Sequence, residues 1–216
     1  MRRSTQILAV FAIAVTLATS SSGCTLLHHA YYVIKGNNVP AEFGGLKGKR
    51  VAVVCVSSSS SYGVDSETTL LANTMALLLR QRVPRISLVS QDEIADWIDS
   101  NSWDQLDYQQ IGRGVKAEML VVVELASFRY RDDATLYQGK ADLAVKVFDV
   151  KSGGDMVWSD RQPDFTFPAN GGYHTTEMSE SRFKREFIKV LAQQAAQHFY
   201  DYEFEESVAR DARLIH

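Results

Sequence analysis

The most constraining feature of this sequence is a pair of uninterrupted apolar runs that are rich in β-branched residues. The runs cover residues 51–56 and 119–123. A strand with one solvated face alternates apolar and polar residues, whereas a run without alternation is typical of a strand that is covered on both faces. The two runs therefore predict buried strands of an α/β sheet.

Helix signals separate the two runs. A leucine-rich helix that ends before Pro84 follows the first run, and a short strand is expected at 86–89. Ser90 and Glu93 form a capping box, which indicates the start of a second helix. Asp104 can cap a third helix ahead of the second run. The chain is thus expected to run strand, helix, strand, helix, helix into the second buried strand.

Alternation replaces the continuous runs in the second half of the chain. Residues 136–150 alternate, as expected for a strand with one face on the core. The Lys-Ser-Gly-Gly stretch at 151–154 is typical of a tight hairpin connection, after which a returning strand begins. We expect an irregular loop at 165–176 and a long final helix that opens at 179–180.

This order of elements predicts the fold class. A strand–helix–strand unit implies a parallel pair with a right-handed crossover, and a meander can extend the same sheet in antiparallel fashion. We therefore expect an α/β mixed-sheet sandwich, with strand-helix-strand-helix-helix followed by an antiparallel meander and a C-terminal helix.

The first residues of the chain indicate export. Arg2 and Arg3 precede an apolar stretch at 7–18, which is shorter than the ~20 residues that a membrane-spanning helix needs. Small residues then lead to Cys24 in a pattern that resembles a lipobox. The leucine that usually opens a lipobox is absent, so two alternatives to lipidation stay open. They are cleavage by ordinary signal peptidase and an uncleaved N-terminal anchor.

The chain is accordingly divided into three parts. Residues 1–23 are expected to be a lipoprotein signal peptide, residues 24–47 a lipid anchor and linker, and residues 48–216 a single periplasmic α/β domain. Acyl chains on Cys24, such as palmitate, would hold the protein on a membrane, because each buried CH₂ contributes ~0.8 kcal/mol. Thr25 is not the aspartate that holds many lipoproteins at the inner membrane, so the outer membrane is favoured.

Charge and composition exclude several classes of function. The formal net charge is −3, and removal of a signal peptide with two arginines and no acids takes it to −5. Nucleic-acid binding calls for clustered Lys and Arg, so no nucleic-acid partner is expected. His28 and His29 are adjacent and do not share a helix face, so neither a metal nor a cofactor is expected. Cys55 lies within the first run and is expected to be a small buried hydrophobe.

A polar run after the first buried strand is the candidate ligand or partner loop. It consists of Ser57, Ser58, Ser59, Ser60, Ser61 and Tyr62. Ligands of α/β sheets bind at the carboxyl ends of strands, which is where this run lies. It lacks the Gly-x-Ser-x-Gly elbow of a hydrolase nucleophile, so a flexible polar loop is the simpler interpretation.

Other residues fit a phosphate-binding or catalytic motif only superficially. Gly112 and Gly114 end a helix and precede a strand, whereas a phosphate loop follows a strand and opens a helix. His174 and His198 could be combined with a serine and an acid, but any chain with five histidines allows such a combination. No catalytic residue is therefore assigned.

Aromatic residues in the expected loops leave two interpretations open. Tyr62, Phe165, Phe167 and Tyr173 either form a protein-binding surface or fold back over the edge of the sheet. The stretch 200–206 alternates aromatic and acidic residues, and it is expected to continue the final helix or to form a docking end.

Three stretches of the chain resemble a known family. Residues 49–54, 111–122 and 141–158 resemble the opening strand, the helix–glycine–strand segment and the hairpin of CsgG-type periplasmic lipoproteins. That group is related to the penicillin-binding-protein activator LpoB and to the TolB amino-terminal domain. The resemblance implies a non-catalytic role in the envelope. The turn at 131–134 is short and charged, unlike a membrane-crossing hairpin, which favours an accessory role over a pore.

These observations lead to one functional hypothesis and one alternative. The hypothesis is a non-catalytic, lipid-anchored protein of the bacterial envelope that acts as an accessory, assembly or scaffold factor. Its partners would be the membrane and an envelope protein or further copies of itself. The alternative is a periplasmic ligand-binding or hydrolytic domain that uses the loop from Ser57 to Tyr62.

Overall fold

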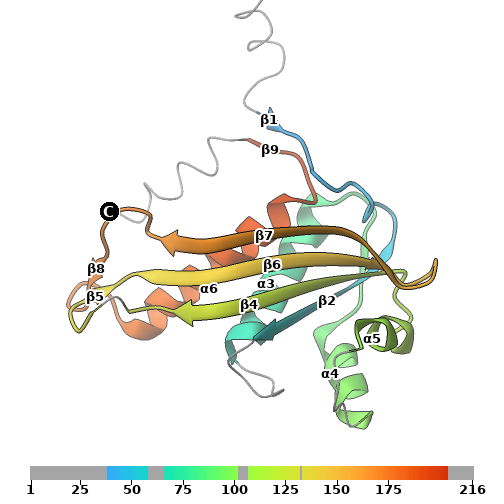
Figure 1. The fold of residues 1–216 in the computed structure, drawn as a ribbon, viewed down its shortest axis with the longest axis horizontal. Coiled ribbons are helices and arrows are strands. Elements are labelled where there is room, and N and C mark those ends of the chain that lie inside the picture. The colour runs from blue at the N-terminus through green and yellow to red at the C-terminus, as the bar shows by residue number, and fades with distance from the viewer. Residues whose placement is uncertain (1–37, 58–65, 102–106, 132, 204–216) are drawn as a thin grey trace, which may run out of the picture.

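A single five-stranded sheet organises the protein (Figure 1). The computed structural model describes residues 38–57, 66–101, 107–131 and 133–203. In spatial order, the sheet contains β3 (Ser87–Leu88), β2 (Arg50–Ser57), β4 (Met119–Arg129), β6 (Gly139–Asp149) and β7 (Asp155–Phe167). β2 is parallel to both β3 and β4, whereas β4–β6 and β6–β7 are antiparallel. The predicted mixed sheet and its meander are therefore confirmed.

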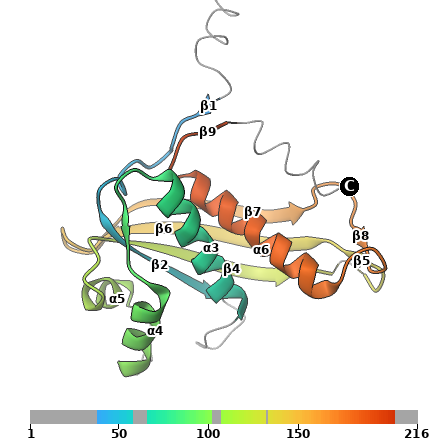
Figure 2. The same ribbon diagram turned by 180° about the vertical axis from the view of Figure 1, so that it is seen from behind.

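Helices lie on both faces of the sheet, but unequally. The helices are α3 (Ser66–Arg82), α4 (Gln91–Ser100), α5 (Tyr108–Gly114) and α6 (Glu180–Gln197). α3 and α6 lie side by side across one face (Figure 2), which we call the covered face. α4 and α5 are shorter and sit at one end of the other face (Figure 1). Most of the surface of β4, β6 and β7 on that side carries no helix.

Two short ribbons complete the described part of the chain. β1 (Asn38–Val39) pairs with β9 (Tyr202–Glu203), and β5 (Leu136–Tyr137) pairs with β8 (Tyr173–His174). The β1–β9 ribbon joins the two ends of the described chain beyond β7, on the side of the sheet remote from α4 and α5 (Figure 1). Within the described residues, no helix is both long and apolar enough to cross a membrane.

The continuous apolar runs explain the two cores. In β2, Val51 and Val53 join the larger core under α3 and α6, while Ala52 and Val54 join the smaller core under α4 and α5. Successive residues of a strand point to opposite faces, so a strand that lies between two cores needs apolar residues throughout. Residues 119–123 of β4 are buried for the same reason.

The predicted N-cap is confirmed for α4 and corrected for α5. The Ser90 hydroxyl accepts the backbone N–H of Glu93 at 3.2 Å, as the capping box predicts. The Glu93 carboxylate binds Arg50 of β2 at 2.9 Å, so this acid ties α4 to the sheet. α5 begins at Tyr108 and is capped by Asp107 rather than by Asp104, which lies outside the described residues. Asp107 is the N-cap residue because its carboxylate accepts hydrogen bonds from the backbone N–H groups of both Gln109 and Gln110.

The C-terminal third departs further from the sequence expectation. β7 extends to Phe167, so residues 165–167 belong to a strand and not to the expected loop. Phe167 is 1% exposed and stacks near Phe183 and Phe187 of α6, which means that it folds back over the sheet. The final helix also does not continue through residues 200–203 as expected, because α6 ends at Gln197 and β9 follows, while 204–206 lie outside the described residues.

Candidate functional site

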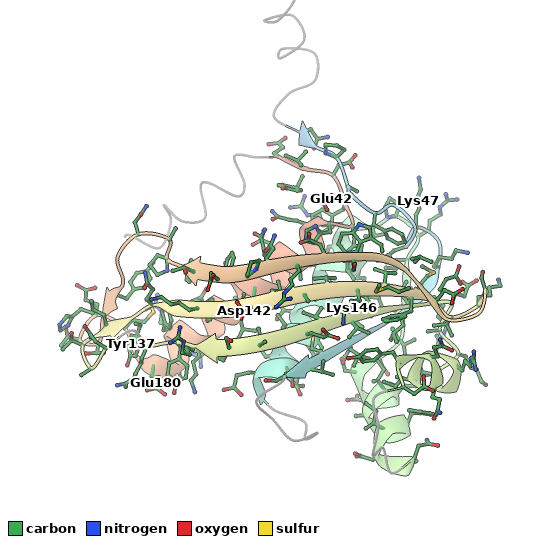
Figure 3. The ribbon with its side chains drawn as sticks, in the orientation of Figure 1. Glu42, Lys47, Tyr137, Asp142, Lys146 and Glu180 are labelled. Carbon is green, nitrogen blue, oxygen red and sulfur yellow. The ribbon has the colours of Figure 1, made fainter. Side chains whose placement is uncertain are left out.

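The surface of β4, β6 and β7 opposite α6 is the candidate functional site, and we call it the open face. Its side chains belong to Glu124, Lys140, Asp142, Ala144, Lys146, Ser159 and Arg161. Along β6, Ala141, Leu143 and Val145 are buried on the covered face, so their neighbours must point the other way. Figure 3 shows Asp142 and Lys146 on this side of the sheet.

One ion pair crosses the middle of the open face. Lys146 Nζ lies 2.6 Å from Glu124 Oε1, and both side chains are 32% exposed. The hydroxyl of Tyr108 donates to the same carboxylate oxygen at 3.1 Å, and its ring lies 5.5 Å from that of Phe148. The carboxylate therefore has two donors, and α5 is joined to the open face through Tyr108.

Asp142 lies between two irregular residues on the neighbouring strands. The register of β4 shifts between Ala126 and Arg129, and that of β7 shifts opposite Ala141–Leu143. Ser127 and Asp164, at these shifts, have φ angles of 51° and 54°. Positive φ is uncommon for residues other than glycine, and each bulge adds an extra residue to its strand.

The Asp142 carboxylate holds both bulges. It accepts the backbone N–H of Asp164 at 2.9 Å. This bond, followed by a hydrogen bond from the Ser127 side chain, lowers the pKa of Asp142, and the positive charges of Arg161 and Arg129 lower it further. A carboxylate with a lowered pKa is a weak base and a persistent anion, so Asp142 is suited to holding the backbone and not to removing a proton.

The bulges change which side chains reach the core. Leu125 and Phe128 both pack in the larger core, although an odd spacing would place them on opposite faces of a regular strand. The ring of Phe128 stacks on Phe187 of α6 at 5.3 Å. On the other side of Asp142, the bulge at Asp164 likewise lets Phe165 pack against the same core. One acid on the open face thus supports aromatic packing on the covered face.

The structure describes only one of the site residues proposed from the sequence. Cys24, Ser58, Ser59, Ser60, Ser61 and Tyr62 lie outside the described residues. Ser57 is the last residue of β2 and pairs with Leu125, one position before Ala126, the partner of Asp142. The serine loop therefore starts at the same end of the sheet as the two bulges.

The remaining candidates from the sequence occupy structural positions. Gly112 packs against Val150 and Gly114 against Trp97, so closely that a Cβ atom at either glycine would clash. Gly112 thus lets α5 approach the β6–β7 hairpin, and Gly114, the last residue of α5, lets it approach α4. Cys55 is a free, half-buried cysteine, and burial of its thiol raises the pKa.

The two described histidines contact a threonine and two carboxylates, respectively. His174 Nδ1 is 2.7 Å from the Thr176 hydroxyl in an exposed turn. His198, at the end of α6, lies between Glu42 and Asp160. Within the described ranges, His, Cys, Asp and Glu side chains do not gather in groups of three or more that could hold a metal ion.

The open face was missed at the sequence level for a simple reason. Lys140, Asp142 and Lys146 alternate with apolar residues, and alternation of this kind indicates only a solvated strand face. The bulges contain no glycine that could have signalled them. The one available hint is the Pro163-Asp164 pair in a strand-like segment, because proline in a strand is confined to edges and bulges.

Comparisons with known proteins return structural likenesses alone. No family model matches the chain. No curated protein matches it either. Among solved structures, PelC from Paraburkholderia phytofirmans, described as a dodecamer, is 13% identical with a TM-score of 0.43, and the match covers 76% of this chain and 95% of that one.

Two further structural neighbours are bacterial lipoproteins. Lipoprotein GNA1162 from Neisseria meningitidis is 11% identical with a TM-score of 0.43, and the match covers 68% of this chain and 97% of that one. The C-terminal domain of LpoB from Escherichia coli is 17% identical with a TM-score of 0.36, over 55% of this chain and 84% of that one. At these TM-scores, the likenesses assign neither a family nor a function to the chain.

Proposed function

We propose that this chain is a lipid-anchored protein of the bacterial envelope that acts through protein–protein contacts and has no catalytic activity of its own. The open face is the observation that carries the proposal. It presents charged side chains from three neighbouring strands on a surface that α4 and α5 cover only at one end. A broad, low-lying polar surface of this kind suits a partner protein better than it suits a small substrate.

The state of the charges supports a binding role. Glu124 already has two donors, and Asp142 is held by Asp164 and Ser127. Groups that act as general bases need a pKa near the working pH, whereas the pKa of Asp142 is lowered. Such preorganised charges favour complementarity with a partner, because their positions change little on binding.

The course of the chain supports an anchor at one edge. The β1–β9 ribbon brings the N-terminal side of the described chain out beyond β7, while α4 and α5 lie beyond β2 (Figure 1). An anchor at Cys24 would thus reach the domain from the β7 side and leave the open face accessible from the periplasm. We place the anchor at the outer membrane because Thr25 follows Cys24.

Crosslinking in intact cells tests the contact surface. A photoreactive amino acid at Ser159, which is exposed on the open face, is expected to form adducts with an envelope protein. The matched control is Asn73, which is exposed on α3. Equal adducts at the two positions, or co-purification of a small molecule with no protein adduct, would contradict the proposal.

The anchor and the alternative function need separate experiments. Incorporation of labelled palmitate is expected for the natural chain and not for Cys24→Ala. Equal labelling of the two would remove the anchor. Replacement of the five serines at 57–61 by alanine is expected to leave crosslinking at Ser159 unchanged. Loss of a co-purifying ligand in that variant would favour the ligand-binding alternative.

A further inference from the structure

We propose that residues 38–47 form a strap that His198 fastens to the domain, and that the fastening depends on the charge of the His198 ring. The inference goes beyond the proposed function. Its test needs neither a membrane nor a partner, so it can fail or succeed independently of the lipid anchor.

The strap is attached at a few separate points. Asn38 and Val39 pair with β9, and the Ala41 N–H donates to Asp201 Oδ1 at 2.8 Å. The Phe43 N–H donates to the backbone carbonyl of His198 at 2.9 Å. Leu46 is fully buried and is the first residue of the described chain whose side chain lies in the core. Between Asn38 and Leu46, the attachment is local enough to open without unfolding the sheet.

The middle of the strap packs against a group of aromatic rings, which we call the aromatic seat. The ring centroid of Phe43 lies 6.1 Å from that of Trp158 on β7 and 6.2 Å from that of Phe199, which follows α6. The Trp158 ring in turn lies 5.0 Å from the ring of His198. The strap therefore covers apolar surface between β7 and the end of α6, and His198 forms one wall of that seat.

The His198 ring has a carboxylate at each nitrogen. Nδ1 lies 3.1 Å from Glu42 Oε2 on the strap, and Nε2 lies 3.5 Å from Asp160 Oδ2 on β7. The His198 side chain is only 7% exposed, and Nε2 has no hydrogen bond within the described part of the chain. The ring is also at the C-terminal end of α6, where the helix dipole favours a positive charge.

Other charges near the strap are already engaged. Asp201 accepts the N–H of Ala41 on the strap. From α3, Arg82 lies over the ring of Tyr200, 5.7 Å from its centroid. Among the described residues, the carboxylates in contact with the ring are those of Glu42 on the strap and Asp160 on β7.

With a carboxylate at each ring nitrogen, the protonation state of His198 affects how firmly the strap is attached. A neutral imidazole has one N–H, so it can donate to only one carboxylate while its lone pair faces the other. The imidazolium has an N–H at each nitrogen, so its charge can attract Glu42 on the strap and Asp160 on β7 together, which compensates for burying it. The strap is thus held more tightly when the ring is protonated than when it is neutral.

Distance measurements on the full-length chain test the strap directly. Spin labels carried by unnatural amino acids at Asn38 and at Asp99 of α4, both exposed, report on strap and domain. At pH 5 we expect one narrow distance distribution. At pH 8 we expect a second, broad population. An unchanged distribution from pH 5 to 8 in the natural chain would overturn the proposal.

Variants separate a charge-dependent role of His198 from a merely structural one. His198→Gln cannot titrate, so its distribution is expected to be the same at both pH values. Glu42→Gln, on an exposed strap residue, removes one carboxylate without touching the core and is expected to weaken the pH response. Phe43→Ala should release the strap at both pH values, and Lys47→Ala, at an exposed neighbour, should behave as the natural chain. A full pH response in both His198→Gln and Glu42→Gln would also overturn the proposal.

Discussion

The two faces of the sheet are built on opposite principles. The covered face is sealed by α3 and α6, and at one end of the sheet it contains a set of stacked rings that includes Phe128, Phe167, Phe183 and Phe187. The open face is held by directional bonds among charged groups, above all those of Asp142 and Glu124. The covered face gains stability from apolar area, whereas the open face gains a defined shape from a few polar contacts.

The two faces are nevertheless coupled through the bulges. Asp142 holds Ser127 and Asp164 from the open side, and the bulges place Phe128 and Phe165 on the covered side. A change on either face should therefore be felt on the other. Substitutions on each face, compared by their effects on the free energy of unfolding, test how much each face contributes to stability.

The largest effect is expected from the covered face. Phe187→Ala removes a fully buried ring that stacks with Phe128 and Phe167, and substitutions of this kind cost about 3–5 kcal/mol. The free energy of unfolding from denaturant titration measures this. Leu77→Ala, on the 53% exposed Leu77 of α3, is the matched control and should change little. Comparable losses in the two variants would contradict the picture of one dominant core.

The next effect is expected from Asp142→Asn, and it should depend on pH. The folded-state pKa of Asp142 is lowered, so the ionised group contributes stability above its unfolded pKa of about 3.9. That contribution is lost as the pH falls through the lower folded-state pKa. The variant should thus melt below the natural chain at pH 7, and the difference should shrink toward pH 2. A constant difference in Tm would rule out this role for the charge.

A smaller effect is expected at the bulge itself. Asp164 has a φ of 54°, and a β-branched side chain is strained there, so Asp164→Val should lose about 1–2 kcal/mol. Asp164→Gly keeps the N–H that binds Asp142 and tolerates positive φ, so its loss should be smaller. Chemical unfolding of both variants checks the order, and a more stable valine variant would show that the bulge is not strained.

The smallest effect is expected from the ion pair on the open face. A double-mutant cycle with Glu124→Gln and Lys146→Met should give a coupling energy below about 1 kcal/mol, because both side chains are partly solvated. The pair Glu186 and Lys189 on α6 provides the matched cycle. A coupling of several kcal/mol would make the open face a second source of stability and not a contact surface.

Sequence patterns were sufficient for the parts of the fold that rest on periodicity. The continuous runs became β2 and β4, the alternating stretch became β6, and the amphipathic final stretch became α6. Each signal is local, since the residues that carry it are neighbours along the chain. The same holds for Ser90, whose capping bond reaches only three residues ahead.

The parts that could not be predicted depend on contacts between distant residues. β1 and β9 are two residues long and lie at opposite ends of the described chain, so neither shows a period. The bulges arise because one acid in β6 bonds to residues of two other strands, and Asp164 looks like a turn residue when Asp142 is not considered. Likewise, Glu42 and His198 are unremarkable in sequence until the strap brings them together.

The strap also sets how far the domain could travel from an anchor at Cys24. From Cys24 to Asn38, where the strap begins, the chain can span at most about 50 Å at ~3.5 Å per residue. From Cys24 to Leu46, where the core holds the chain, the limit is about 75 Å. If Cys24 anchors the chain as proposed, opening the strap would therefore lengthen the reach of the domain from its anchor by roughly half.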